Sequence, residues 1–99
     1  MYRFPRTLFV NNGLFDQVKH VRSEAFEAVD AYMKPDIAHL AEELFDVIHS
    51  AETGLRILDE RYEVDLIAIE ALVLEKNARR GYYKLTDLVE TFPALEVAA

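Results

Sequence analysis

Apolar residues recur at three- and four-residue spacing along three long stretches of the chain, which is the period of an amphipathic α-helix. The first stretch predicts a helix from about Leu14 to Met33, and the second predicts one from about Ile37 to Asp59. The third predicts a helix from about Leu66 to Arg80, and a short helix is expected at about 86–91. The pattern therefore predicts an all-α fold, an antiparallel helical bundle of three main helices plus a short C-terminal element.

Local signals support the ends of these helices. Lys34 precedes a proline and so disfavours helical geometry, which ends the first helix, and Asp36 can cap the second. Gly81 follows the third helix, where glycine is common. Gly54 falls inside the second helix, and we expect it to mark a kink or a close contact.

The third helix differs from the first two in how its apolar residues are distributed. The first two predicted helices carry single apolar stripes: Val18, Val21, Ala25, Ala28, Val29 and Tyr32 on the first, and Ile37, Leu40, Ala41, Leu44, Val47, Ile48, Ala51, Leu55 and Leu58 on the second. The third is apolar almost all the way round, so it must be buried on more than one side. Three helices cannot easily cover it, and we therefore expect the bundle to be completed by dimerisation, as a homodimer or a dimer of dimers.

Length and composition limit the possible classes of protein. The 99 residues allow one domain, 1–99, and 52% hydrophobic residues can supply a core. The absence of cysteine excludes disulfide scaffolds, thiolate zinc sites and cysteine nucleophiles. No apolar run approaches the roughly 20 residues of a membrane span, and the stretch 8–10 is too short for a signal peptide. We expect a cytoplasmic protein.

Charge is unevenly distributed along the chain. The formal net charge is -7, and residues 22–52 carry eight acids and two bases. This balance argues against binding to nucleic-acid polymers or to membrane surfaces, which requires clustered cations. Residues 76–84 instead hold four bases, Lys76, Arg79, Arg80 and Lys84, with no acid. The two segments suit a metal-bound polyphosphate, but solvated helix faces with a basic helix C-terminus would give the same pattern.

Two pairs of acids are candidates for a metal site. Glu24 and Glu27 are three residues apart on the first helix, and Glu43 and Asp46 are three apart on the second. Each pair falls beside the apolar stripe, so antiparallel packing through the stripes would bring the pairs face to face. Converging carboxylates repel one another unless a cation binds, and Mg²⁺ prefers such oxygen ligands. The alternative is two unrelated pairs on helix surfaces.

The three histidines, His20, His39 and His49, each lie three or four residues from one of these acids. Each is either a metal ligand or outer partner of a carboxylate, or a partly exposed side chain without a role. No serine or threonine lies in a nucleophile-elbow motif, which argues against a catalytic triad.

These motifs resemble those of a known family. Glu24-Ala-Phe-Glu27, a gap of 15 residues and Glu43-Leu-Phe-Asp46 resemble the ExxE…ExxD motif of the MazG-like, all-α nucleoside triphosphate pyrophosphohydrolases. The segment 74–83 is similar to the end of that family's third helix, where a Lys-Asn-x-x-Arg run is typical. The resemblance covers about 14–83. The first motif lacks the doubled acids often found at its start.

The resemblance implies a fold, an activity and a set of site residues. It implies a helical bundle completed by dimerisation, and Mg²⁺-dependent cleavage of a nucleoside triphosphate to monophosphate and pyrophosphate, with Mn²⁺ as a possible substitute. It assigns metal-site and catalytic roles to Glu24, Glu27, Glu43 and Asp46, and contacts with the phosphates or sugar to Lys76, Asn77 and Arg80. No base-selecting element is recognisable, so the substrate could also be a damaged nucleotide or a related phosphate ester. The alternative is a non-enzymatic helical dimer, a regulatory or antitoxin-like interaction protein.

Overall fold

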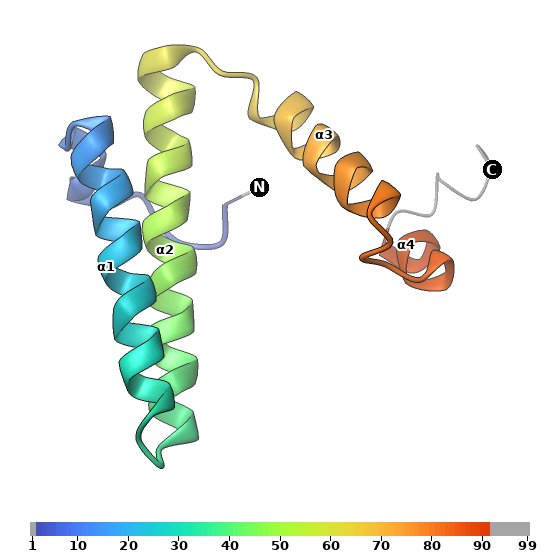
Figure 1. The fold of residues 1–99 in the computed structure, drawn as a ribbon. Helices are drawn as coiled ribbons and strands as arrows, with labels where there is room; N and C mark the ends of the chain where they lie inside the picture. The colour runs from blue at the N-terminus through green and yellow to red at the C-terminus, as the bar shows by residue number, and fades with distance from the viewer. Residues whose placement is uncertain (1, 92–99) are drawn as a thin grey trace. The chain divides into compact units, whose positions relative to one another are not determined.

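The computed structural model of the chain describes residues 2–91, and these residues form helices and no strand. A short 3-10 helix, η1, is followed by four α-helices (Figure 1). Their bounds are Leu8–Asn11 for η1, Leu14–Tyr32 for α1, Ile37–Tyr62 for α2, Leu66–Arg79 for α3 and Leu85–Thr91 for α4. The predicted all-α class is confirmed, and each helix ends close to its predicted position. The remainder of the predicted C-terminal element, 92–99, lies outside the described residues.

The chain divides into two compact units, Met1–Val64 and Asp65–Ala99. The first unit contains η1 and the antiparallel pair α1 and α2, which pack against each other (Figure 1). The second contains α3 and α4.

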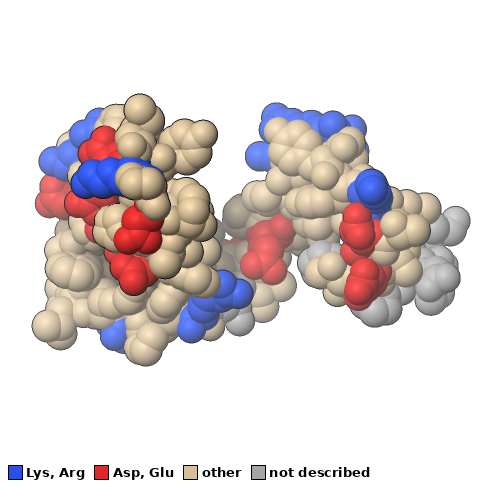
Figure 2. Space-filling model, turned by 90° about the horizontal axis from the view of Figure 1, so that it is seen from below, with Lys and Arg blue, Asp and Glu red and all other residues tan. Residues whose placement is uncertain are grey.

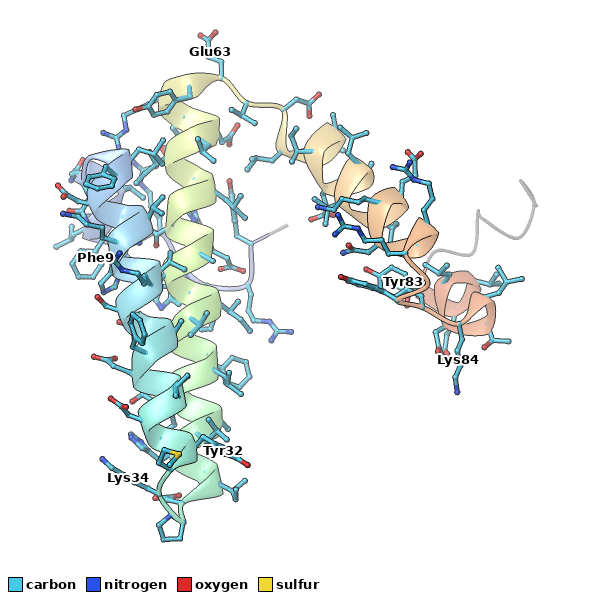
Figure 3. The ribbon with its side chains drawn as sticks, in the orientation of Figure 1. Phe9, Tyr32, Lys34, Glu63, Tyr83 and Lys84 are labelled. Atoms are coloured by element: carbon cyan, nitrogen blue, oxygen red, sulfur yellow. The ribbon has the colours of Figure 1, made fainter. Side chains whose placement is uncertain are left out.

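A tight turn joins α1 to α2, and Tyr32 and Lys34 lie at this end of the hairpin (Figure 3). The Asp36 side chain accepts a hydrogen bond from the backbone N–H of His39 at 3.0 Å, which is the predicted N-cap. At the other end of α2, Glu63 adopts a left-handed conformation with φ 53° and terminates the helix. The second helix of the hairpin therefore begins and ends at local capping interactions.

The two helices meet along one edge of the predicted apolar stripes. The buried residues of the hairpin are Gln17, Ala28 and Ala31 on α1, and Ser50, Thr53 and Ile57 on α2. Ala28 belongs to the predicted stripe of the first helix, and the stripe residues Val21 and Val47 are half-buried, whereas Val18 is 56% exposed and Tyr32 is 71% exposed. The stripes therefore form part of the contact, and polar groups that bond to each other complete the seam. The acidic flank of each helix consequently lies at the seam.

Gly54 lies within the continuous helix α2 and faces α1. A Cβ atom at this position would lie 3.8 Å from Cγ of Gln17, which is ordinary van der Waals contact. The space around Gly54 would therefore accept a small side chain, and the close contact that was one of the two alternatives for this residue is not observed.

The segment 2–12, here called the N-terminal strap, lies against α2. The Glu52 carboxylate accepts hydrogen bonds from the backbone N–H groups of Arg3 at 2.7 Å and Phe4 at 2.9 Å. Arg56 donates to the carbonyl oxygen of Phe4 at 2.7 Å. One carboxylate and one guanidinium of α2 thereby fix the course of the strap.

In the second unit, α3 starts at an Asp65 cap, whose side chain accepts from the backbone N–H of Ala68 at 3.1 Å. Gly81 follows the helix with a φ of 75°, as the predicted glycine stop requires. Ile67 and Leu72 of α3 are exposed, although Leu66 is buried. None of the helices in residues 2–91 combines the length and apolarity that a membrane span requires.

Candidate metal centre

Three of the four predicted acids converge between α1 and α2. Glu24, Glu27 and Glu43 each offer a carboxylate oxygen, and these oxygens all lie within 4.8 Å of one another. Several acidic side chains are also close together on the hairpin surface that Figure 2 displays. The antiparallel hairpin thus brings residues of both predicted pairs to one place.

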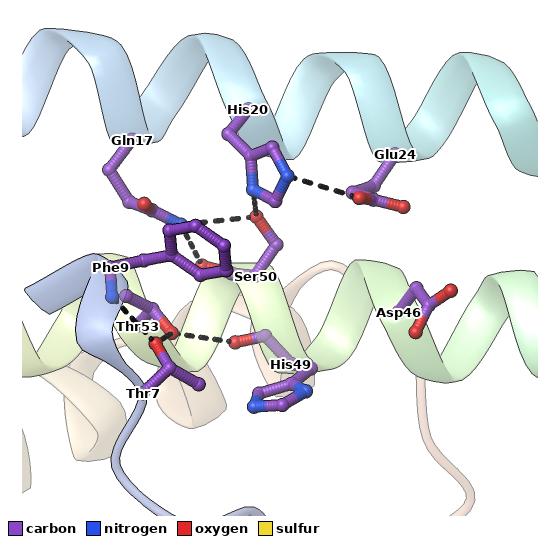
Figure 4. A pocket seen from close by; sticks show the side chains of 9 residues that line it. All are labelled: Thr7, Phe9, Gln17, His20, Glu24, Asp46, His49, Ser50 and Thr53. Carbon is purple, nitrogen blue, oxygen red and sulfur yellow. Dashed lines mark hydrogen bonds and ion pairs between the residues drawn. The ribbon is translucent and has the colours of Figure 1, made fainter. Parts of the chain in front are cut away.

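Asp46 is not part of this close set. It is exposed and lines a pocket that adjoins the carboxylates, together with Glu24 (Figure 4). Its charge nevertheless contributes to the electrostatics of Glu24, as described below.

Two of the three histidines contact these carboxylates. Nε2 of His20 lies 3.1 Å from Oε1 of Glu24, and Nε2 of His39 lies 3.4 Å from Oε1 of Glu43. In both cases the histidine is four residues before the acid, one helical turn away. His20 and His39 therefore lie where outer partners of the carboxylates would, whereas His49 stacks on the ring of Phe4 with centroids 4.4 Å apart.

The second oxygens of two carboxylates are left without a partner. Oε2 of Glu24 and Oε2 of Glu43 are buried and accept no hydrogen bond from any group in residues 2–91. Both side chains are only 16% exposed. A buried anionic oxygen without a donor is costly, and a bound cation would compensate it. The residues present therefore fit a divalent cation with a preference for oxygen ligands.

The electrostatics of Glu24 also favour a bound cation. Burial raises the pKa of Glu24 above its ordinary value of 4.5, and a proton shared with Glu27 and repulsion from Glu27 raise it further. His20 lowers the pKa and Asp46 raises it slightly. When both carboxyl groups are ionised, neither can donate, which leaves Oε2 of Glu24 unpaired. The site thus favours either a proton or a cation.

A pocket of about 280 Å³ opens beside Glu24 and Asp46 (Figure 4). The strap contributes one wall and the two helices contribute the others. The lining residues are Thr7 and Phe9 from the strap, Gln17, His20 and Glu24 from α1, and Asp46, His49, Ser50 and Thr53 from α2. The pocket presents hydroxyl groups and an aromatic ring next to the carboxylates.

Ser50, His20 and Glu24 lie in the order of a serine, histidine and acid triad. Oγ of Ser50 is 2.8 Å from Nδ1 of His20, whose Nε2 faces Glu24. Ser50 is, however, only 5% exposed, lies inside a helix, and accepts an N–H from Gln17 at 3.2 Å. A nucleophile must reach its substrate, so this arrangement does not serve as a nucleophilic triad.

The predicted substrate-binding residues lie together in the second unit. Lys76 and Asn77 belong to the last turn of α3, and Arg80 follows as its C-cap. Arg80 donates its backbone N–H to the carbonyl of Lys76 at 3.1 Å. The carboxylates belong to the first unit. A basic helix C-terminus is favourable in itself, so the position of these bases agrees with either of the two interpretations of the charge pattern.

Sequence reasoning missed Gln17, Ser50 and Thr53 as residues of the site. All three are buried polar residues, next to or within the apolar stretches of their helices. Polar residues in such positions were the available signal, because a buried polar group must find a partner.

Comparison with known proteins adds no assignment, since no family model, curated protein or solved structure matches the chain.

Proposed function

We propose that the protein is a Mg²⁺-dependent nucleotide pyrophosphohydrolase, which cleaves a nucleoside triphosphate to monophosphate and pyrophosphate. The observation that carries this proposal is the convergence of Glu24, Glu27 and Glu43 with two buried, unpartnered oxygens. The resemblance of the motifs around these acids to the MazG-like enzymes supplies the reaction.

The carboxylates are proposed to have different roles. Glu24 and Glu43 are the less exposed acids and would hold the ion with their unpartnered oxygens. When bound, Mg²⁺ would neutralise phosphate charge and lower the pKa of a bound water. Glu27 is exposed to solvent beside them and would accept the proton of the attacking water. Asp46, at the pocket edge, would add negative charge that favours the cation.

The pocket beside Glu24 gives the rest of the nucleotide a place to bind. It shares Glu24 with the metal centre, so a ligand in it would lie next to the proposed cleavage site. Thr7 offers a hydroxyl and Phe9 an aromatic face, which suit a sugar and a base. From the resemblance, Lys76, Asn77 and Arg80 are proposed to contact the phosphates or the sugar, and the cationic Lys76 and Arg80 would stabilise a pyrophosphate leaving group.

The proposal includes a homodimer or a dimer of dimers. The apolar stripes of the hairpin and several apolar residues of α3 are exposed, including Tyr32, Ile37 and Leu72. Exposed apolar surface of this kind marks an interaction site.

The same exposed surface favours the second candidate, a non-enzymatic dimer that acts as an interaction protein. This candidate needs the apolar surface and not the carboxylates. Metal-dependent release of pyrophosphate distinguishes the two functions directly.

The first test is a panel of nucleoside triphosphates with Mg²⁺ or Mn²⁺, assayed for pyrophosphate. We expect release that requires the ion, and a loss of turnover by orders of magnitude in Glu43→Gln, since this change removes a ligand oxygen. Glu42→Gln is the matched control, because Glu42 is the neighbouring acid and its side chain is 77% exposed. Equal turnover in Glu43→Gln and Glu42→Gln, or no pyrophosphate from any nucleotide, would exclude this activity.

A second test separates the basic residues from the acids. Arg80→Ala removes a charge-assisted bond worth roughly 1.5–3 kcal/mol. If this bond is equal in ground and transition states, KM rises at nearly constant kcat, and excess Mg²⁺ does not restore it. Asp46→Asn should instead lower kcat and respond to Mg²⁺. Unchanged constants in Arg80→Ala would mean that the bases only complement the end of α3.

A further inference from the structure

A chain of hydrogen bonds leads from the strap through the hairpin seam to Glu24, and Figure 4 shows its part from Gln17 to Glu24. Nδ2 of Asn12 donates to Oε1 of Gln17 at 3.0 Å, and Nε2 of Gln17 reaches Oγ of Ser50 at 3.2 Å. Oγ of Ser50 lies 2.8 Å from Nδ1 of His20. Nε2 of His20 lies 3.1 Å from Oε1 of Glu24.

The direction of this chain follows from groups that can act in only one way. Nε2 of Gln17 also faces the backbone carbonyl oxygen of Ser50 at 3.0 Å, and a carbonyl oxygen only accepts. The amide nitrogen of Gln17 must therefore point toward Ser50, and Oγ of Ser50 accepts from it. The single hydroxyl hydrogen of Ser50 is then available to Nδ1 of His20.

This order selects the tautomer of a neutral His20 ring. With Nδ1 accepting from Ser50, the ring hydrogen lies on Nε2 and is donated to Oε1 of Glu24. One oxygen of Glu24 is thus held by His20, and the other, Oε2, is the buried oxygen without a partner.

We propose that Ser50 and His20 are positioning residues, which hold the Glu24 carboxylate in the orientation that presents Oε2 to the cation. This inference rests on the proposed metal site. Partners of this kind orient ligands and raise metal affinity in other metal sites. Ser50 is distinctive because it contacts no carboxylate itself and can influence the ion only through His20.

The equivalent contact on α2 has no such anchor. His39 reaches Oε1 of Glu43 with one nitrogen, but its other nitrogen pairs with Glu42 at 3.5 Å, on the exposed surface. On α1 the second nitrogen is bound to Ser50, which is buried beside the fully buried Gln17. Glu24 is therefore the preset ligand, and Glu43 is the ligand free to adjust when the ion binds.

The experiment measures the dissociation constant of Mn²⁺ alone by calorimetry for the parent, Ser50→Ala, His20→Asn and the double variant. The Asn side chain of His20→Asn is too short to reach Glu24, and Ser50→Ala removes the hydroxyl that orients His20. We therefore expect each single variant to bind Mn²⁺ about 10- to 100-fold more weakly. Because both act through one contact, the double variant should bind no more weakly than His20→Asn. His20→Gln, which can donate an amide hydrogen to Glu24, should recover most of the affinity.

Thr53→Ala is the matched control. Thr53 is buried one turn beyond Ser50 and lines the same pocket, but it donates to the carbonyl oxygen of His49 and stands outside the chain. Its Mn²⁺ affinity should equal that of the parent. A thermal melt without metal verifies that every variant is folded at the temperature of the titration.

Three results overturn the inference. The first is a Ser50→Ala variant that binds Mn²⁺ as tightly as the parent, and the second is a Thr53→Ala variant that loses as much Mn²⁺ affinity as Ser50→Ala. The third is a double variant whose loss of Mn²⁺ affinity equals the sum of the two single losses. A parent that binds no Mn²⁺ would overturn both the positioning role of Ser50 and His20 and the metal site itself. If the parent binds Mn²⁺ with the expected pattern of variants but hydrolyses no nucleotide, the positioning role stands and the proposed activity falls.

Discussion

At the scale of single residues, Glu24 is held in a position that is unfavourable for the metal-free protein. Burial and the neighbouring Glu27 raise its pKa, whereas the contact with His20 opposes them. The folded chain therefore retains a proton that the unfolded chain releases. Burial and repulsion from Glu27 destabilise the ionised carboxylate when no metal is bound. They also increase its attraction for a cation, because a cation would offset the repulsion and give the unpaired oxygen a partner.

The pH dependence of stability should show this effect. Below the ordinary pKa of 4.5, Glu24 is protonated in both states and contributes no difference. Between pH 4.5 and the raised pKa of the folded state, the unfolded chain releases this proton and the folded chain retains it, so the free energy of unfolding falls as the pH rises. Without metal, Glu24→Gln should be more stable than the parent at neutral pH, with an advantage that disappears in acid.

Urea unfolding in a chelating buffer at pH values from about 4 to about 8 measures this difference. Added Mg²⁺ should stabilise the parent more than Glu24→Gln, since a ligand of the folded state shifts the equilibrium toward it. A parent that is the more stable protein at neutral pH without metal would contradict the origin of the shift.

The sequence indicated the acids of the site and, as one alternative, the histidines beside them, but not the buried polar groups Gln17 and Ser50. Two pairs at helical spacing identify Glu24, Glu27 and Glu43, because a helix repeat is a local property. The bond from Gln17 to Ser50 spans 33 positions, and it depends on how two helices rotate about their axes. Spacing along one helix cannot fix that rotation.

At the scale of elements, the helix ends were predictable and the packing face was predictable in part. The proline turn, the Asp36 cap and the Gly81 stop are local, and the structure has all three. The stripe residue Ala28 is buried where α1 and α2 meet, but so are Gln17 and Ser50, which lie off the stripes. The hydrophobic period does not reveal that polar residues bonded to each other complete this seam.

The Asp36 cap offers a test of the hairpin turn. Its side chain satisfies a backbone N–H that has no partner within α2. Asp36→Ala should lower the free energy of unfolding by about 1 kcal/mol, whereas Asp36→Asn should cost little, since both residues cap well. Chemical denaturation of the three proteins measures these values. Equal losses in both variants would assign the effect to charge instead of to the cap.

At the scale of the whole molecule, most of the large apolar side chains in the described residues are exposed and few are buried. The buried hydrophobic side chains within residues 2–91 are Val10, Ala28, Ala31, Ile57 and Leu66. A core of this size offers little stabilisation. Larger apolar side chains, among them Ile37 and Ile67, remain exposed, which supports the dimer proposed above.

The mass in solution tests that proposal. Sedimentation equilibrium at micromolar concentration should give at least twice the chain mass of 11.4 kDa. Leu72→Glu places a charge among the exposed apolar residues of α3 and should shift the mass toward the monomer, because burying an unpaired charge is costly. Arg79→Glu introduces the same side chain at the polar end of that helix and should leave the mass unchanged. A parent near 11.4 kDa would show that the exposed apolar surface does not join copies of this chain.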